Sequence, residues 1–300
     1  MQAGTVAWIG RYLGHLRTER RLSPHTESNY RRDLEALVAY CEREGIPGWK
    51  KLDNFHIRSF AAREHRDGLG PRSVQRRLSA LRGFFNYLIR ERVIEANPAA
   101  DIRAPKAPKR LPKTLDVDQV ASLLERRAPD ALARRDLAMM ELLYSSGLRL
   151  AELAGLDVAD LDLADRTVRV TGKGSKTRIL PVGKQAAAAL RAWLADRAGF
   201  VKGGASALFV GRDGRRLGAR AIQRRIDRWA QAAGIGVPVH PHLFRHSFAT
   251  HLLESSRDLR GVQELLGHAD ISTTQVYTHL DFQHLARIYD ESHPRARRRK

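Results

Sequence analysis

The segment from residue 97 to residue 114 constrains the fold more than any other part of this sequence. It reads NPAADIRAPKAPKRLPKT and contains four prolines with lysines between them. Proline lacks a backbone N–H and fixes φ, so prolines at this density prevent a helix and favour an extended connector. The segment therefore predicts a boundary between two domains, which we place at residues 1–97 and 115–300, with residues 98–114 as the linker.

Each side of this boundary is long enough to fold around its own core. The chain has 300 residues, of which 43% are hydrophobic and 29% are charged. That balance is typical of globular domains, because enough apolar surface is available to offset the chain entropy lost on folding.

The N-terminal domain is expected to contain only helices. Residues 23–45 begin with a serine and a proline, which are favoured at helix starts, and end at Gly45. Another helix opens at Pro71, and its apolar stripe runs from Val74 to Leu88.

After the linker, the period of the hydrophobic pattern changes once. Residues 166–182 contain two short β-branched runs around GKGS, which is typical of a hairpin with a tight glycine turn. The fold class is therefore mainly α with a small β-hairpin or sheet. Helices are expected at residues 116–128, 132–146, 184–198, 219–233, 241–254, 259–266 and from 272 onward.

The charge of the chain predicts a polyanionic partner. Lys and Arg number 53 against 33 Asp and Glu, which gives a net charge of +20. Nucleic acid is the favoured partner, because the arginine fork matches phosphate oxygens; a coding bias toward Arg and Ala is the alternative. The candidate DNA contacts are Arg72, Arg76, Arg77 and Arg82, which otherwise form a solvated helix face, and Lys106, Lys109 and Arg110, which otherwise belong to a plain interdomain linker.

The cysteine content and hydropathy indicate a cytoplasmic protein. Cys41 is the only cysteine, which excludes an intramolecular disulfide and fits a reducing compartment. No segment approaches the roughly 20 apolar residues that span a bilayer, and the N-terminus has helical spacing instead of a signal-peptide run. We expect no membrane association.

Two of the stretches that carry candidate chemistry are a segment before the predicted hairpin and the tip of the hairpin itself. In SSGLRLAEL, Arg149 follows a helix end at Gly147, and Glu152 lies three residues later where it can orient a neighbour; a helix cap with a surface ion pair is the alternative. Lys173 lies at the hairpin tip, where it is a phosphate contact, a proton donor or a solvated turn lysine. The GKGSK pattern lacks the spacing of a nucleotide-binding P-loop.

The stretch HPHLFRHSFATHL predicts a helix with two faces. His242 and Arg245 share the polar face, while Phe244, Phe248 and Leu252 form the buried face. Four nearby histidines also permit a zinc site, but neither a cysteine nor an H-E-x-x-H pattern supports it. We expect neither a metal nor another cofactor.

The stretch LLGHADISTTQVYTH places a tyrosine among polar neighbours. Gly267 ends one helix, so His268 emerges just beyond it, and Ser272 with Gln275 forms a capping box that starts the next helix. Tyr277 lies early in that second helix. Tyrosines are usually packed in cores, but the polar neighbours of Tyr277 make a purely buried role less natural.

In this order, the four stretches resemble the tyrosine recombinase (phage integrase) family, with its pattern R…K…H-x-x-R…H…Y, and in particular the Xer branch. The likeness extends over nearly the whole chain and includes DFQHLA after the tyrosine. Phe244, where leucine is familiar, is the one departure, and it concerns packing. The resemblance implies that the nucleophile is Tyr277, that Glu152 supports the first arginine, and that the other catalytic residues are Arg149, Lys173, His242, Arg245 and His268.

The resemblance also implies a reaction and an assembly. Two lobes would form a C-shaped clamp around duplex DNA, and a 3'-phosphotyrosyl intermediate would make strand exchange independent of ATP. The expected partners are a XerD-like recombinase in a heterotetramer at a dif-type site and an FtsK-like translocase, with chromosome dimers as the substrate. The alternatives are a phage or transposon integrase, a type IB topoisomerase activity, a catalytically silent DNA-binding protein, and a metal-dependent nuclease built on the histidines.

Overall fold

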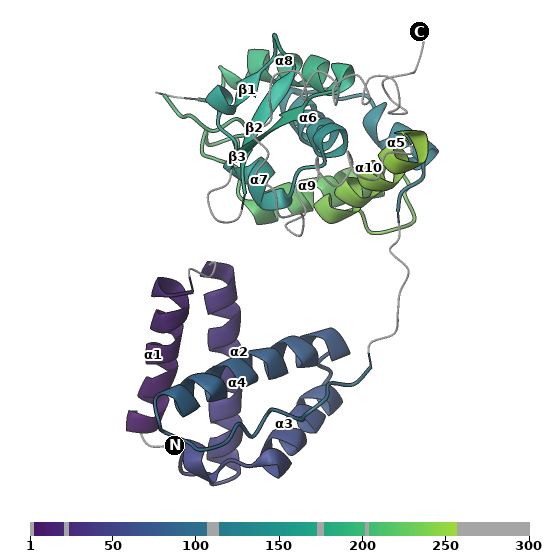
Figure 1. Ribbon diagram of the computed structural model, residues 1–300. Helices are drawn as coiled ribbons and strands as arrows, with labels where there is room; N and C mark the ends of the chain where they lie inside the picture. The colour runs from purple at the N-terminus through teal and green to yellow at the C-terminus, as the bar shows by residue number, and fades with distance from the viewer. Residues whose placement is uncertain (1–2, 21–23, 107–113, 173–176, 202–203, 257–300) are drawn as a thin grey trace. The chain divides into compact units, whose positions relative to one another are not determined.

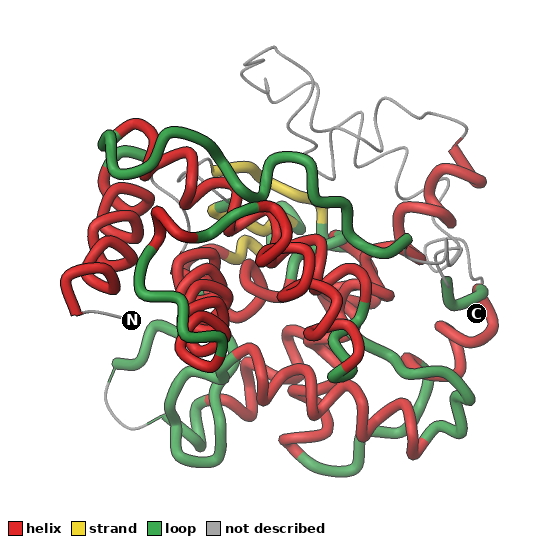
Figure 2. Tube along the Cα trace, turned by 90° about the horizontal axis from the view of Figure 1, so that it is seen from below, coloured by secondary structure: helices red, strands yellow, loops and turns green. Residues whose placement is uncertain are grey.

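The computed structural model describes residues 3–20, 24–106, 114–172, 177–201 and 204–256 (Figure 1). The chain divides into two compact units, residues 1–111 and 112–300. Helices make up most of the described chain, and the strands form one small sheet, shown in yellow in Figure 2. The predicted fold class, mainly α with a small sheet, is therefore confirmed.

The first unit is built from helices whose apolar faces meet in one core. Tyr12 contacts Phe84 edge to face, with ring centroids 5.5 Å apart, beside Gly83. A Cβ at Gly83 would collide with the Tyr12 hydroxyl oxygen, so this packing favours a glycine. The described helices of this unit are α1 (Ala3–Thr18), α2 (Pro24–Arg43), α3 (Asn54–Arg66) and α4 (Pro71–Arg90), with a short 3-10 turn at Trp49–Lys51.

A buried carboxylate joins three of these helices. Asp33 of α2 is fully buried and accepts hydrogen bonds from Arg76 and Arg77 of α4. Arg77 also donates to Glu64 of α3. Because a buried carboxylate is costly unless it is paired, these contacts hold α2, α3 and α4 in one arrangement.

The first residues of the predicted linker pack against this unit. Ala99 and Ile102 are buried in its core. Arg82 donates through Nε to the Ala99 carbonyl oxygen at 3.0 Å, and it also donates to the Ile102 carbonyl. The prolines exclude a helix here, but arginine supplies the donors that the non-helical carbonyls need. The bounds of the linker, 98–114, and of the two flanking domains stay predictions.

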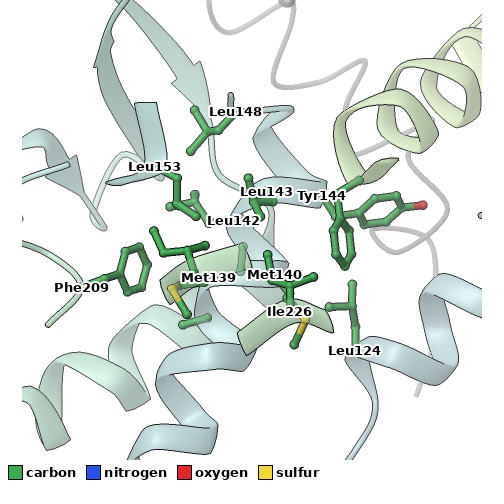
Figure 3. Packing of buried hydrophobic residues seen from close by; sticks show 14 of the residues in the cluster. Leu124, Met139, Met140, Leu142, Leu143, Tyr144, Leu148, Leu153, Phe209 and Ile226 are labelled. Carbon is green, nitrogen blue, oxygen red and sulfur yellow. The ribbon is translucent and has the colours of Figure 1, made fainter. Parts of the chain in front are cut away.

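The second unit is centred on α6. Twelve of its sixteen residues are buried, and Figure 3 shows Met139, Met140 and Tyr144 of this helix among side chains from several other elements. A helix that is buried on nearly all sides supports everything packed around it. The other described helices are α5 (Val117–Leu124), α7 (Leu150–Gly155), α8 (Lys184–Arg197), α9 (Ala219–Ala232) and α10 (Pro241–Ser256), and α6 itself is Ala131–Ser146.

The two strands of the predicted hairpin are confirmed and have a third strand beside them, whereas residues 173–176, in the predicted glycine turn, lie outside the described residues. Strands β2 (Thr167–Thr171) and β3 (Thr177–Pro181) pair antiparallel, and β1 (Leu161–Asp162) adds to β2. Val168 lies opposite Leu180, and Val170 lies opposite Arg178, so these four positions face the core.

The lengths of some elements differ from the predictions. Helix α5 ends at Leu124, four residues before the predicted end, and the six-residue α7 was not predicted because one turn and a half carries almost no periodic signal. The helices predicted at 259–266 and from 272 lie outside the described residues.

Replacing Asp33 by alanine is expected to destabilise the first unit by about 3 kcal/mol, because it leaves the largely buried Arg77 without this partner. Hydrogen exchange of the α2 and α4 amides would measure this loss. Glu27→Ala is the control, since Glu27 pairs on the same helix with Arg31, whose side chain is half exposed, and its loss should cost less than about 1 kcal/mol. Equal effects of the two substitutions would contradict the role given to Asp33.

Candidate active site

The site begins at the turn that ends α6. Gly147 has φ 58°, a left-handed conformation that glycine adopts without strain, and it redirects the chain into α7. Arg149 therefore stands at the N-cap of α7 with an extended backbone. Its side chain is 42% exposed, so the guanidinium is anchored inside the unit and still accessible to a ligand.

Glu152 binds Arg149 in the way the spacing predicted. The Arg149 backbone N donates to Glu152 Oε2 at 2.8 Å, and Arg149 Nη1 donates to Oε1 at 2.9 Å. The Glu152 side chain is only 4% exposed. The bond from the Arg149 backbone N is that of a helix cap, as the alternative expected, but the carboxylate is buried instead of lying on the surface.

Arg178 is a residue of this site that the sequence analysis missed. It projects from β3 and makes a bidentate contact with Glu152, with Nη1 and Nη2 donating to the two carboxylate oxygens at 2.9 and 3.0 Å. The available signal was the alternation of β3: Arg178 and Leu180 share the face that points to the core, and a charged side chain there requires a buried partner.

These contacts keep Glu152 ionised. Burial raises the pKa of Glu152, but the hydrogen bonds from Arg178 and Arg149 outweigh burial and hold the pKa below its ordinary range. At neutral pH the residue is therefore a fixed negative charge between two guanidinium groups.

Arg245 of α10 reaches the same turn from another direction. Its Nη1 donates to the carbonyl oxygen of Gly147. Burial, and after it the charge of Arg149, lower the pKa of Arg245 to about 10, so the group stays charged at neutral pH. Three guanidinium groups and one carboxylate thus meet here, and the excess of positive charge favours an anion such as a phosphate.

The predicted two faces of α10 are confirmed. Phe244, Phe248 and Leu252 are buried, whereas His242 is exposed and Arg245 is partly buried. Phe244 fits the core without exposure, so the departure from leucine is accommodated by packing.

The histidines around α10 have separate environments. His251 is buried and its Nδ1 lies 2.8 Å from the Tyr144 hydroxyl, whereas His240 Nδ1 accepts a hydrogen bond from the Leu243 backbone N at 3.1 Å. The ring of His242 lies 6.4 Å from that of His240. Across the described ranges, no three His, Cys, Asp or Glu side chains are grouped so that they would hold a metal ion.

Several predicted residues are not placed with the site. Lys173, His268 and Tyr277 lie outside the described residues, as do Lys109 and Arg110. Arg72 and Lys106 are exposed on the first unit. Arg76, Arg77 and Arg82 bind the protein groups given above, so a DNA contact by any of the seven basic residues stays a prediction.

Comparison with known proteins agrees with these observations. The family described as "Phage integrase family" matches residues 113–284, and "Phage integrase, N-terminal SAM-like domain" matches residues 9–92. Tyrosine recombinase XerC of Azotobacter vinelandii is 58% identical over 290 residues, and XerC of Pseudomonas syringae pv. tomato is 56% identical over 289; each alignment covers 96% of both chains.

A solved structure supports the same fold. The XerH site-specific recombinase bound to its difH substrate has a TM-score of 0.71, with 23% identity, over 94% of each chain.

The fold and these relatives define a site-specific DNA recombinase. The chain belongs to the phage integrase family, and it is a tyrosine recombinase similar to XerC. The predicted family and the Xer branch are therefore confirmed. Separately, none of the helices in the described part of the chain has the length and apolar character needed to cross a membrane.

The second unit should lose stability in mild acid. Burial lowers the pKa of His251 below its ordinary 6.5, so below about pH 6.5 the unfolded chain binds a proton that the folded chain resists. The opening free energy of α6 and α10 amides, measured by hydrogen exchange, should therefore fall between about pH 7.5 and pH 5.5. This fall should be smaller in His251→Gln. The exposed His246→Gln controls for loss of a histidine from the same helix, and an unchanged pH dependence in His251→Gln would contradict the expectation.

Proposed function

We propose that this recombinase cuts and rejoins duplex DNA with Tyr277 as the nucleophile and with Arg149 and Arg245 bound to the scissile phosphate. The observation that carries the proposal is that these two arginines meet beside the turn at Gly147: Arg149 is the N-cap residue of α7, and Arg245 of α10 binds the Gly147 carbonyl and feels the charge of Arg149. Arginine forks bind phosphate oxygens bidentately, and both guanidinium groups are held before any substrate arrives.

Fixed positive charge at this point favours the transition state over the ground state. As a nucleophile attacks a phosphodiester, negative charge builds up on the non-bridging oxygens, and preorganised donors stabilise that charge without reorienting. Glu152 keeps Arg149 oriented and lowers the mutual repulsion of the arginines, so the groups can remain close together.

The covalent step conserves the energy of the phosphodiester bond, because one phosphate ester replaces another. The Tyr277 oxygen forms a bond to phosphorus, the bond from phosphorus to the 5'-oxygen breaks, and the products are a 3'-phosphotyrosine and a free 5'-hydroxyl. Attack by a 5'-hydroxyl on the phosphotyrosine reverses these steps, so neither ATP nor another cofactor is consumed.

Proton transfers are assigned to the remaining residues. Lys173 gives a proton to the leaving 5'-oxygen, and His242 assists removal of the proton from Tyr277. His268 adds a hydrogen bond to the phosphate oxygens. The exposure of His242 on the same helix as Arg245 supports its part, since the imidazole is accessible to a substrate.

The cellular role is proposed from the relatives. Two XerC proteins are similar over almost their whole length, and the XerH structure contains a difH substrate. We therefore assign to this chain a dif-type site, a cytoplasmic location, and the resolution of chromosome dimers during segregation. It would act in a heterotetramer with a XerD-like recombinase under an FtsK-like translocase. The identity to XerC proteins favours this role over that of a phage or transposon integrase.

The net charge of +20 supports a clamp of two lobes on duplex DNA. In this proposal Arg72 and Lys106, which are exposed, contact phosphates directly, together with Lys109 and Arg110 of the linker. Arg76, Arg77 and Arg82 would contact the DNA through donors that their protein partners leave available.

A nicked suicide substrate with a dif-type site should trap the intermediate. The wild type is expected to form a covalent protein–DNA adduct on a denaturing gel, with EDTA present, whereas Tyr277→Phe should form none because it lacks the attacking oxygen. Tyr144→Phe removes a hydroxyl that contacts His251 in the interior and is the matched control. An adduct from Tyr277→Phe would show that the nucleophile is another residue.

Loss of one phosphate-binding arginine should slow cleavage sharply. For Arg149→Ala or Arg245→Ala we expect about 3 kcal/mol less transition-state stabilisation, or a rate roughly 100- to 1,000-fold lower, as for loss of one oxyanion donor. Single-turnover adduct formation measures the rate. Arg169→Ala is the control, because Arg169 of β2 is exposed and pairs with Asp160. A rate near that of the wild type in both site variants would refute the assignment.

A further inference from the structure

Arg178 occupies a position that is costly for a charged side chain. It faces the core from β3 and its side chain is only 15% exposed. Its Nε is buried and finds no acceptor among the described residues, so the guanidinium is only partly satisfied there. A buried charge whose Nε has no acceptor in the described part of the chain is not explained by stability alone, because an apolar side chain would pack at lower cost.

We propose that Arg178 is a positioning residue that holds Glu152, and through Glu152 orients Arg149, for binding the scissile phosphate. The inference rests on the proposed function, in which Arg149 contacts that phosphate. It adds a residue that acts on the reaction without touching the substrate.

The hydrogen bonds show how the orientation is transmitted. Each oxygen of Glu152 accepts one bond from Arg149 and one from Arg178. The carboxylate is therefore fixed from two sides and cannot rotate without breaking bonds to both arginines.

The two arginines differ in how firmly they are held. Arg178 is enclosed and its backbone lies in a strand paired along its length with β2. Arg149 is 42% exposed and stands at the start of a helix of six residues. The sheet therefore holds Arg178 in place, Arg178 holds Glu152, and Glu152 in turn orients Arg149, which is the group that binds the ligand.

The test measures adduct formation and DNA affinity on the same suicide substrate. Arg178→Lys keeps the positive charge beside Glu152, so the carboxylate stays paired and the protein stays folded, but it loses the bidentate geometry. We expect cleavage slower by roughly 10- to 100-fold, with a DNA dissociation constant within about twofold of the wild type. Arg169→Lys, an exposed arginine on β2, is the matched control and should match the wild type in both measurements.

A double-mutant cycle tests whether Arg178 affects cleavage through Glu152. If Arg178 acts through Glu152, the rate loss caused by Arg178→Lys should be much smaller in a Glu152→Gln background than in the wild type. Equal losses in both backgrounds would overturn the proposal, as would a cleavage rate of Arg178→Lys equal to that of the wild type.

A substrate with a modified leaving group distinguishes the positioning role of Arg178 from proton donation by a residue of the neighbouring hairpin turn. A 5'-bridging sulfur leaves without needing a proton, so a substrate with sulfur at that position should leave the Arg178→Lys defect in place. Restoration of the wild-type rate by sulfur would overturn the proposal. Absence of any adduct from the wild type on the ordinary substrate would instead refute the proposed function, so the two failures are distinguishable.

Discussion

The buried carboxylate of Glu152, held by guanidinium groups on both sides, is the interaction on which the site depends. Removing a carboxylate from water costs several kcal/mol unless hydrogen bonds replace its hydration. Four bonds do so here: one from the Arg149 backbone N, and three from guanidinium nitrogens, which also fix the cations of Arg149 and Arg178. The negative charge of Glu152 therefore holds positively charged arginines together at a place where a phosphate can bind.

The surrounding fold determines from which element each of these groups enters the site. Central helix α6 ends at Gly147, whose left-handed backbone turns Arg149 into the site and presents a carbonyl oxygen to Arg245 of α10. The buried Tyr144–His251 contact joins α6 to α10 a short way from that turn. The positions of the arginines therefore follow from how two helices, α6 and α10, and one strand, β3, pack together.

Local patterns in the sequence were sufficient for helices α2, α4, α6, α8, α9 and α10, for the paired strands β2 and β3, and for the pair of Arg149 with Glu152. Each of these depends on residues within a few positions of one another, and spacing reveals such contacts. Arg178 and Glu152 are 26 residues apart and meet only because the sheet packs beside α7. Likewise, Asp33 binds Arg76 and Arg77, although the spacing of residues in α4 alone placed these arginines on a solvated face. Ile102 is buried in the core of the first unit, which the neighbouring prolines did not predict. Long-range partners are set by packing, which a single sequence does not display.

The central claim is that Arg149 neutralises charge on the scissile phosphate. Replacing a non-bridging oxygen there by a methyl group makes the linkage neutral, so it tests the claim directly. Single-turnover adduct formation would be compared for the wild type and Arg149→Ala on the phosphodiester and on the methylphosphonate. We predict that the loss caused by Arg149→Ala, about 3 kcal/mol on the phosphodiester, shrinks to less than about 1 kcal/mol on the neutral linkage. An equally large loss on both substrates would contradict the account.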